Sequence, residues 1–241
     1  TSNTGGTVTP PNLPPSSGLV REFFRDITTV SSSNAGNIGT VESAVDAATA
    51  TSTTTVSDIF IADLNVDDAY QYSGYVYLEA GQTYQVSGSR DDTLMVKLGG
   101  TTVYGVGFNN WGAFTASGFT PSVSGYYSLE VVAYNGDGVG DLDINMSVNG
   151  GPALDLNTTN FRLYSNASDF TGSPTVSGPM VPNGDGGYYP AGAGGTEDSS
   201  IRLGTISASL NDTDGSETLA LAIGGIPVGA VITDGTNSFT A

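Results

Sequence analysis

The sequence YQVSGSRDDTLMVKL, residues 84–98, predicts two β-strands that meet at a pair of carboxylates. Apolar side chains recur at every second position on either side of its centre: Tyr84, Val86, Leu94, Val96 and Leu98. This period of two is typical of strands with one face in a core. Adjacent side chains of a regular strand point to opposite faces. Asp91 and Asp92 can therefore serve one ligand only if the backbone is irregular there or forms a loop tip.

The rest of the chain predicts an all-β protein, built as an antiparallel β-sandwich. Its 241 residues include 34 Gly and 11 Pro among Thr-, Ser-, Val- and Tyr-rich segments, a composition typical of strands joined by turns. Further strands are predicted at residues 59–64, 70–86, 101–106, 126–134, 141–148 and 160–165, separated by turn signals at 79–82, 99–100 and 123–125. A short helix is predicted over residues 41–48.

Charge and residue types limit the chemistry of the protein. Asp and Glu total 24 against 6 Lys and Arg, so the formal net charge is -18. Such a surface repels nucleic acid and anionic lipid, and no run of about 18 apolar residues predicts membrane insertion. The absence of Cys and His excludes thiolate and Ser-His nucleophiles and ordinary zinc or haem sites. The remaining oxygen ligands suit Ca²⁺.

A second candidate ligand loop follows the strand at residues 126–134. It reads NGDGVGDLDI and places four polar side chains among three glycines: Asn135, Asp137, Asp141 and Asp143. Glycines let main-chain carbonyls turn toward a cation, and Asn and Asp add side-chain oxygens. An Asx- and Gly-rich loop between strands is more often an ordinary hairpin turn, so this loop alone is a weak signal.

Together these pieces resemble the protective-antigen-type β-sandwich domain of anthrax protective antigen, yeast flocculins and large bacterial adhesins. The resemblance covers residues 18–170 and rests on GLVREFF, YLEAGQTYQVSGSRDDTLMVKLGG, a Gly-Tyr-Tyr strand and AYNGDGVGDLDINM. It implies that a cis peptide joins Asp91 to Asp92 and that both carboxylates bind one calcium ion, whose open positions take two neighbouring sugar hydroxyls. Thr93 departs from the family pattern, which has Gly at this position.

The same resemblance implies the remaining members of the site. The calcium ligands would be the Asp91 and Asp92 carboxylates, the Asn135 side chain and the main-chain carbonyls of Asp137 and Val139. The sugar would meet Asp91, Asp92 and Asn135, together with Arg90 and Trp111. Trp111 is the only Trp, and it either walls the sugar site or packs in the core. We favour the core for Trp111, because most single tryptophans pack.

Composition divides the chain into four parts. Residues 1–17 are a Pro-, Thr- and Ser-rich linker, residues 18–170 the sandwich, and residues 171–194 a Gly- and Pro-rich linker. Residues 195–241 resemble the first part of an immunoglobulin-like or cadherin-like extender module of adhesins. There, DTDGSE offers Asp212, Asp214 and Glu217 as a second candidate calcium site, with an exposed acidic turn as the equal alternative. We expect the chain to be a segment of a longer, secreted, cell-surface adhesin.

Three classes of function are compatible with these features. The leading one is a calcium-dependent carbohydrate-binding (lectin) domain of a large bacterial surface adhesin, which binds glycans of host or neighbouring cells in attachment or biofilm formation. The alternative is a structural or peptide-binding adhesin module in which calcium only rigidifies the loops. An enzyme comes last, because glycoside hydrolysis needs two carboxyls roughly 5–9.5 Å apart across a bond. We predict no catalytic residue.

Overall fold

The computed structural model describes residues 13–30, 36–108, 111–173, 175–183, 186–191, 228–233 and 236–240. The chain divides into two compact units, residues 1–201 and 202–241, and each is described by itself. No helix in the described part of the chain is long and apolar enough to cross a lipid bilayer.

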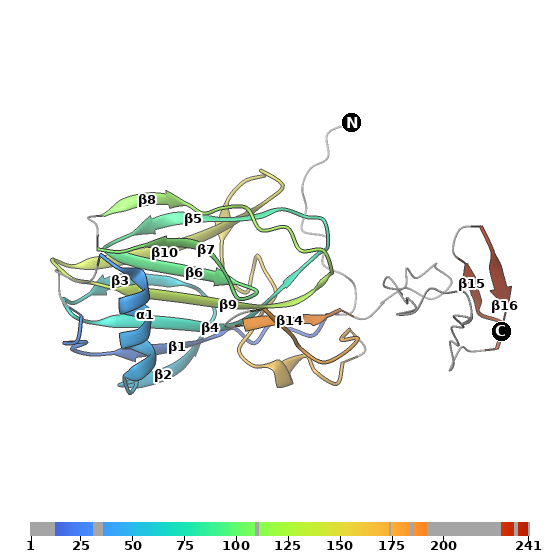
Figure 1. Ribbon diagram of the computed structural model, residues 1–241, viewed down its shortest axis with the longest axis horizontal. Helices are drawn as coiled ribbons and strands as arrows, with labels where there is room; N and C mark the ends of the chain where they lie inside the picture. Colours follow the sequence, from blue (N-terminus) through green and yellow to red (C-terminus); the bar gives the residue numbers. More distant parts are fainter. Residues whose placement is uncertain are drawn as a thin grey trace, which may run out of the picture. The chain divides into compact units, whose positions relative to one another are not determined.

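The first unit is a two-sheet antiparallel β-sandwich, which confirms the predicted fold class (Figure 1). Within the described residues its larger sheet has nine strands: β1 (Leu19–Phe24), β2 (Ser52–Val56), β4 (Ala69–Leu78), β6 (Thr93–Leu98), β7 (Thr101–Val106), β9 (Gly125–Tyr134), β12 (Leu163–Tyr164), β13 (Val181–Asn183) and β14 (Gly186–Pro190). The smaller sheet has five: β3 (Phe60–Leu64), β5 (Tyr84–Arg90), β8 (Gly112–Thr115), β10 (Gly140–Val148) and β11 (Leu154–Asp155).

The alternating residues of both sheets interdigitate in one main core. From the larger sheet this core takes Tyr72, Val76, Leu129 and Val131, and from the smaller sheet Val86, Leu142 and Ile144. The central pairing, β4 with β9, runs without interruption from Ala69 opposite Tyr134 to Leu78 opposite Gly125. The period of two predicts these inward positions because a strand with one wet face must send alternate residues to the core.

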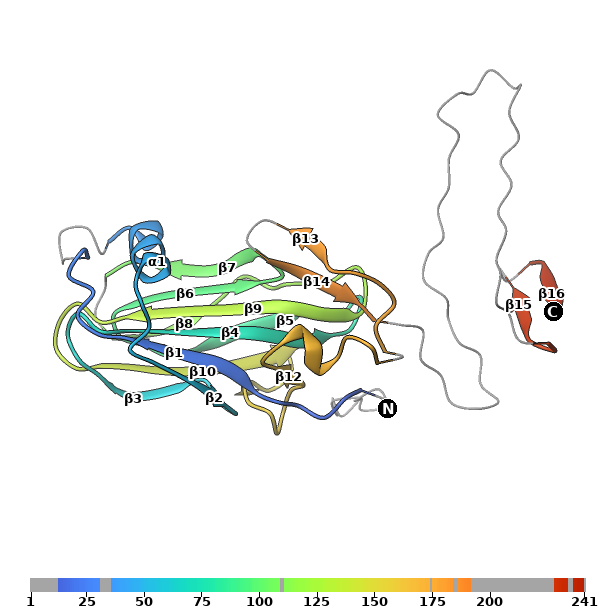
Figure 2. The same ribbon diagram turned by 90° about the horizontal axis from the view of Figure 1, so that it is seen from below.

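The outer face of the larger sheet carries its own cover at one end. The helix α1 (Ile38–Ala47) packs Val41 and Val45 there against a second apolar cluster, which includes Met95 and Val132 of the sheet. Figure 2 shows α1 on that side of β6 and β7. The spacing of Val41 and Val45 puts both side chains on one helical face. The Asn37 side chain accepts a hydrogen bond from the Gly39 N–H at 3.0 Å and caps the helix. The helix predicted over residues 41–48 is thus confirmed, although it begins three residues earlier.

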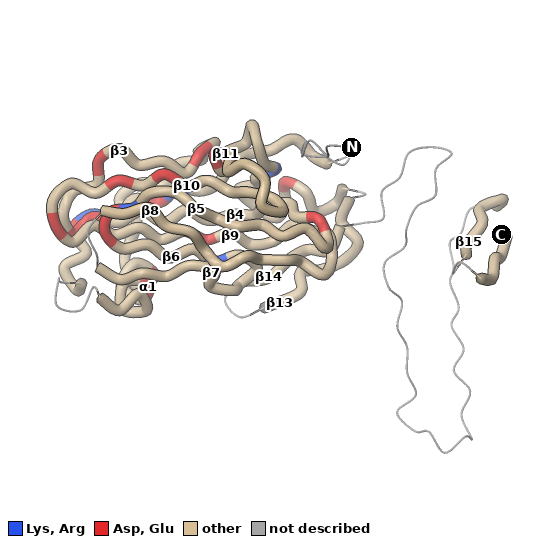
Figure 3. Tube along the Cα trace, turned by 90° about the horizontal axis from the view of Figure 1, so that it is seen from above, with Lys and Arg blue, Asp and Glu red and all other residues tan. Residues whose placement is uncertain are grey.

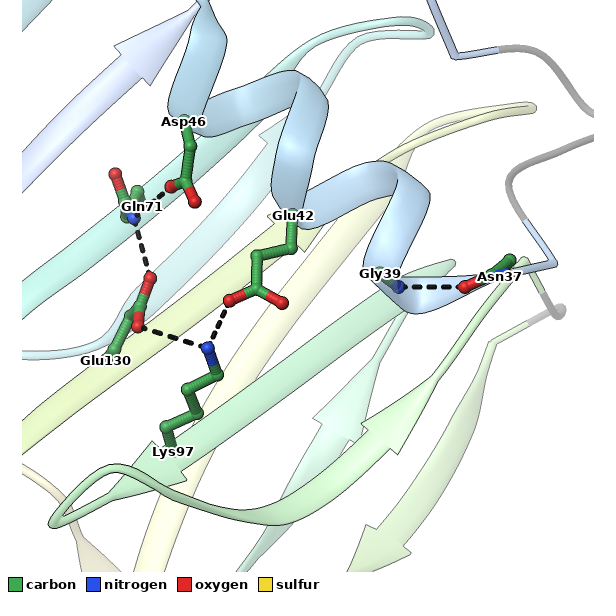
Figure 4. A network of polar contacts seen from close by, with 7 residues as sticks. All are labelled: Asn37, Gly39, Glu42, Asp46, Gln71, Lys97 and Glu130. Atoms are coloured by element: carbon green, nitrogen blue, oxygen red, sulfur yellow. Dashed lines mark hydrogen bonds and ion pairs between the residues drawn. The ribbon is translucent and has the colours of Figure 1, made fainter. Parts of the chain in front are cut away.

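Lys97 links the helix to the sheet through charge (Figure 4). Its side chain is only 6% exposed, and its ammonium pairs with the Glu42 carboxylate of α1 and lies 3.9 Å from Glu130 Oε2 of β9. Burial raises the pKa of Glu130, while Gln71, which donates to Glu130 Oε1 at 2.8 Å, and Lys97 oppose that rise. Lys97 therefore neutralises two partly buried carboxylates at once.

Replacing Lys97 with Met should lower the free energy of unfolding by roughly 1–3 kcal/mol, because Glu42 and Glu130 are left without their cation. A carboxyl whose pKa is higher in the folded chain than in the unfolded one destabilises the fold when ionised. The deficit should therefore be full at neutral pH and shrink as pH falls through the raised pKa of Glu130. Urea unfolding at pH 7 and pH 5 measures this. The triple variant that adds Glu42→Gln and Glu130→Gln should recover most of the loss, and a triple variant as unstable as Lys97→Met would contradict the electrostatic account.

Two predicted linkers are partly corrected by the structure. Within residues 171–194, β14 pairs with β9 so that Tyr188 lies opposite Tyr127, with the two rings stacked at 4.6 Å. At the other end of the chain, Ser17 Oγ donates to Asp169 Oδ2 at 2.6 Å, and the Tyr164 hydroxyl donates to the Pro14 carbonyl at 2.8 Å. The sandwich therefore extends beyond residues 18–170, because β14 pairs with β9 and residues 14–17 contact the segment around β12. Local composition does not reveal such long-range contacts.

The second unit is described only at residues 228–233 and 236–240. There, β15 (Val231–Thr233) pairs antiparallel with β16 (Ser238–Thr240). The remainder of the predicted extender module lies outside the described residues.

Candidate functional site

The acidic pair lies where the chain crosses from one sheet to the other. β5 belongs to the smaller sheet and β6 to the larger one, and Asp91 and Asp92 are the two residues between them. Their peptide bond is cis, as the resemblance implies. The central run thus forms two strands that meet at paired carboxylates, as predicted. Figure 3 shows further acidic positions along the loops at that end of the sandwich and on β3 and β10.

Asp92 fastens the pair to the loop between β9 and β10. The side chain is buried, with the residue 2% exposed, and Oδ2 accepts hydrogen bonds from the Gly136 N–H at 2.9 Å and the Asp137 N–H at 3.0 Å. Two backbone donors to one carboxylate oxygen fix the orientation of the side chain. These two bonds fix the Asp92 carboxylate through Oδ2, and neither of them involves Oδ1.

The loop itself is held by Asn135, which is fully buried. Its amide nitrogen donates to the Leu64 carbonyl at 2.7 Å and to the Gly138 carbonyl at 3.2 Å, and its Oδ1 accepts from the Asp137 N–H at 3.3 Å. A Cβ at Gly140 would lie 2.6 Å from the Asp91 carbonyl oxygen, so only glycine lets β10 start this close to the acidic pair. The acidic pair and the 135–139 loop, which the sequence presents as two separate candidate sites, are thus in direct contact.

The two carboxylates crowd each other electrostatically. Burial raises the pKa of Asp91 to about 6, helped by the hydrogen bond and charge of Asp92 and by the charge of Asp141, while Arg90 opposes the rise. Like charges that share a site disfavour ionisation. A bound cation would relieve this repulsion, and the oxygen donors around it are the kind that calcium takes.

Strand register brings two more side chains to this point. Arg90 lies opposite Gly112 of β8 and opposite Leu142 of β10, so Trp111 and Asp141 flank Asp91 in the adjacent positions. The Asp91 N–H donates to the Asp141 carbonyl at 3.0 Å. Burial and Asp143 raise the pKa of Asp141, and a hydrogen bond from the Trp111 side chain opposes this. Asp141 Oδ1 is a buried acceptor without a hydrogen-bond partner among the described residues.

The core interpretation of Trp111 is wrong, because the residue is 61% exposed. Trp111 lies immediately before β8, the edge strand of the smaller sheet next to β5. Its side chain hydrogen-bonds to Asp141, which lies beside the acidic pair. A solitary Trp gives no pattern from which this can be read. Asp141 was visible in the sequence as a member of the NGDGVGDLDI loop, but the resemblance does not include it in the ligand set.

Arg90 also differs from its predicted role as a sugar contact. It is 5% exposed, and its guanidinium donates to the Asp92 carbonyl at 3.1 Å and to the Tyr104 hydroxyl at 3.4 Å. A side chain buried this deeply supports the main chain of the acidic pair from behind. Its positive charge helps to keep Asp91 ionised.

Solved structures share this arrangement of strands. The PA14 domain of the MpAFP antifreeze protein superposes with a TM-score of 0.54 at 23% identity, over 66% of this chain and 96% of that one. A PA14 sugar-binding domain from an RTX adhesin gives 0.52 at 20% identity, over 61% and 98%. The fold is a PA14-type β-sandwich. No family model matches the sequence, and none of the curated proteins does.

Within the PA14-type sandwich, the remaining predicted ligands fall on the rim of the acidic pair. Asp137 and Val139 are exposed, Val139 by 64%, and Gly138 between them has a φ of +69°, which glycine adopts without strain. The second candidate calcium site, Asp212, Asp214 and Glu217, lies outside the described residues. Among the described residues no group of three or more acidic side chains forms a ready-made metal cage. Calcium at this site would therefore need, besides the Asp91 and Asp92 carboxylates, main-chain carbonyls, the Asn135 amide oxygen and ligands from outside the protein.

Proposed function

We propose that this chain is a calcium-dependent carbohydrate-binding domain of a large bacterial surface adhesin. The observation that carries the proposal is the Asp91-Asp92 pair, which is held against the 135–139 loop by the two hydrogen bonds to Asp92 Oδ2. A hard cation takes oxygen donors. The site offers two carboxylates that repel each other, a neighbouring side-chain amide and the main-chain carbonyls of a glycine-rich loop. The PA14-type fold, which the sugar-binding domain of an RTX adhesin shares, supports the same assignment.

Each residue then has a defined task. Asp91 and Asp92 provide the charge, Asn135 provides its amide oxygen, and Asp137 and Val139 provide carbonyls. Arg90 and Asp141 position the acidic pair, and the exposed indole of Trp111 offers an apolar surface for a sugar ring. Bound calcium supplies open coordination positions for two neighbouring hydroxyls. A small, wet, polar site of this kind buries few ligand atoms, so we expect millimolar affinity for monosaccharides.

The proposed partners are glycans on host or neighbouring cells, with further adhesin modules beside this one in the same polypeptide. The proposed location is the outer cell surface, where a role in attachment or biofilm formation would be exerted. The net charge of -18 fits a calcium-rich exterior better than contact with nucleic acid or anionic lipid.

A glycan array with calcium, repeated with chelator, tests the proposal. Binding of glycans that carry a free vicinal diol should appear with calcium and vanish with chelator. Methylation of either hydroxyl of the diol should abolish competition by the free monosaccharide. Calcium binding in calorimetry without any calcium-dependent glycan on the array would favour the structural alternative, in which the ion only rigidifies the loops.

Trp111→Ala should weaken glycan binding by roughly fivefold or more, about 1 kcal/mol, because an aromatic face is removed from the ligand. The calcium affinity without sugar should stay the same, since no atom of Trp111 belongs to the ligand set. Calorimetric titrations of calcium and of sugar separate the two effects. Phe239→Ala is the control: Phe239 is also 61% exposed but lies in the second unit. Equal losses in both variants would remove Trp111 from the sugar site.

A further inference from the structure

The outer face of the larger sheet holds a cavity of about 360 Å³ outside the calcium site. Its floor is formed by two cross-strand pairs of β4 and β9, Ser73 opposite Glu130 and Tyr75 opposite Ser128. Its walls come from segments far apart in the sequence, the turn at residues 165–167 and the β13–β14 hairpin. Figure 2 shows β14 along the same edge of β9 that β6 occupies further along the strand.

The polar lining of the cavity is dominated by neutral groups. It contains the amides of Gln71 and Asn166 and the hydroxyls of Ser73 and Ser128, with one carboxylate, Glu130. Gln71 Nε2 donates to Glu130 Oε1 at 2.8 Å, and Lys97 lies 3.9 Å from the other oxygen, as Figure 4 shows. The carboxylate is thereby fixed in place and partly neutralised before any ligand arrives.

An aromatic ring, that of Tyr75, also lines the cavity. Tyr75 is held edge-on by Phe170 at 5.1 Å and by Tyr189 at 5.7 Å between ring centroids. Met180, the residue immediately before β13, adds an apolar side chain to the lining. A fixed aromatic ring beside hydroxyls, amides and a carboxylate matches a ligand that has polar edges and one apolar face.

These features select the class of ligand. The partly buried Glu130 carboxylate and the strongly acidic chain disfavour phosphates and other anions, and Lys97 reduces the attraction for a cation. A cavity near the lower end of the usual size range for small-molecule sites suits one compact polar ligand. Saccharides carry hydroxyl edges and a C–H face, so they satisfy both kinds of lining.

The cavity is separate from the calcium site. Glu130 precedes Asn135 by five positions along the same chain direction, which is roughly 15–20 Å at the rise of a strand. Ser128 and Glu130 point to the outer face of the sheet, away from the main core that Leu129 and Val131 enter. We propose that this cavity is a second, calcium-independent binding site for a neutral saccharide unit.

Saturation-transfer NMR in chelator, with a panel of neutral mono- and disaccharides, tests the proposal. At least one neutral sugar should bind to the whole chain at millimolar concentration, and Asp92→Ala should leave that affinity unchanged. Ser73→Leu, which fills the floor, should weaken it at least tenfold. Met180→Trp narrows the opposite wall and should do the same, so that misfolding of one variant, seen as a lost thermal transition, leaves the other informative.

Thr53→Leu is the matched control, because Thr53 is an exposed strand hydroxyl on β2 that does not line the cavity. It should bind like the unaltered chain. Three outcomes would overturn the proposal: no neutral sugar binds in chelator, binding survives both filling variants, or binding disappears with Asp92→Ala. The last outcome would place the ligand at the acidic pair. Loss of calcium binding alone would contradict the proposed lectin site but not this one.

Discussion

Asp92→Asn should reduce calcium affinity by roughly 100-fold and abolish calcium-dependent glycan binding. The amide is nearly the same shape as the carboxylate, and its oxygen can still accept from the Gly136 and Asp137 N–H groups that Asp92 Oδ2 now binds. The variant therefore keeps the loop in place and removes only charge. Calcium sites are tuned by the number of charged ligands, so this single charge carries a large share of the affinity.

The matched control for Asp92→Asn is Asp137→Asn. It makes the same chemical change in the same site, but the side chain is exposed and the proposed ligand is the main-chain carbonyl. Calcium affinity should stay within about threefold, since only long-range, screened attraction is lost. Calorimetry with calcium and a glycan array with both variants measure the contrast. Full glycan binding by Asp92→Asn, or an equal loss in both variants, would rule out the acidic pair as the ion's anchor.

The sequence predicts the centre of the site well because its determinants are local. Alternation on both sides of residues 89–92 predicts that Asp91 and Asp92 lie between two strands, and they do. The 135–139 loop follows a strand whose alternation is equally clear. Neither pattern reveals that Asp92 and the loop hydrogen-bond directly across 44 residues. That contact depends on the sheet order, which puts β6 and β9 side by side.

The errors share one cause, which is the dependence of burial on distant partners. Tyr188 lies in a Gly- and Pro-rich segment typical of a linker, but β9 offers it an edge to pair with and a Tyr127 ring to stack on. Trp111 is hydrophobic enough for a core, but it precedes a strand at the sheet's margin. Arg90 alternates with polar neighbours, yet the crossing between the sheets encloses it. In each case composition predicts the average environment, and topology decides the actual one.

Calcium should raise the stability of the first unit substantially. The ion binds the assembled loops far better than the unfolded chain, so each tenfold rise in calcium above the dissociation constant adds about 1.4 kcal/mol. At 100 times the dissociation constant the gain is about 2.7 kcal/mol. For a domain of this size that raises the melting temperature by roughly 5–11 °C. Burial, together with the repulsion of its acidic neighbours, raises the pKa of Asp91 to about 6, and the bound ion removes the repulsive part of this cost.

Thermal scans in calcium, magnesium and chelator check this prediction, with Asp92→Asn as the control chain. Magnesium should substitute poorly, because it requires a tight octahedral shell and releases its waters reluctantly. Lowering the pH below about 6 should shrink the calcium effect, since the ion must then displace a proton from Asp91. Asp92→Asn should melt at nearly one temperature in all three solutions. If the melting temperature of the unaltered chain were also the same in all three solutions, the acidic pair and the 135–139 loop would be ordinary acidic turns. The proposed calcium-dependent lectin function would then be contradicted.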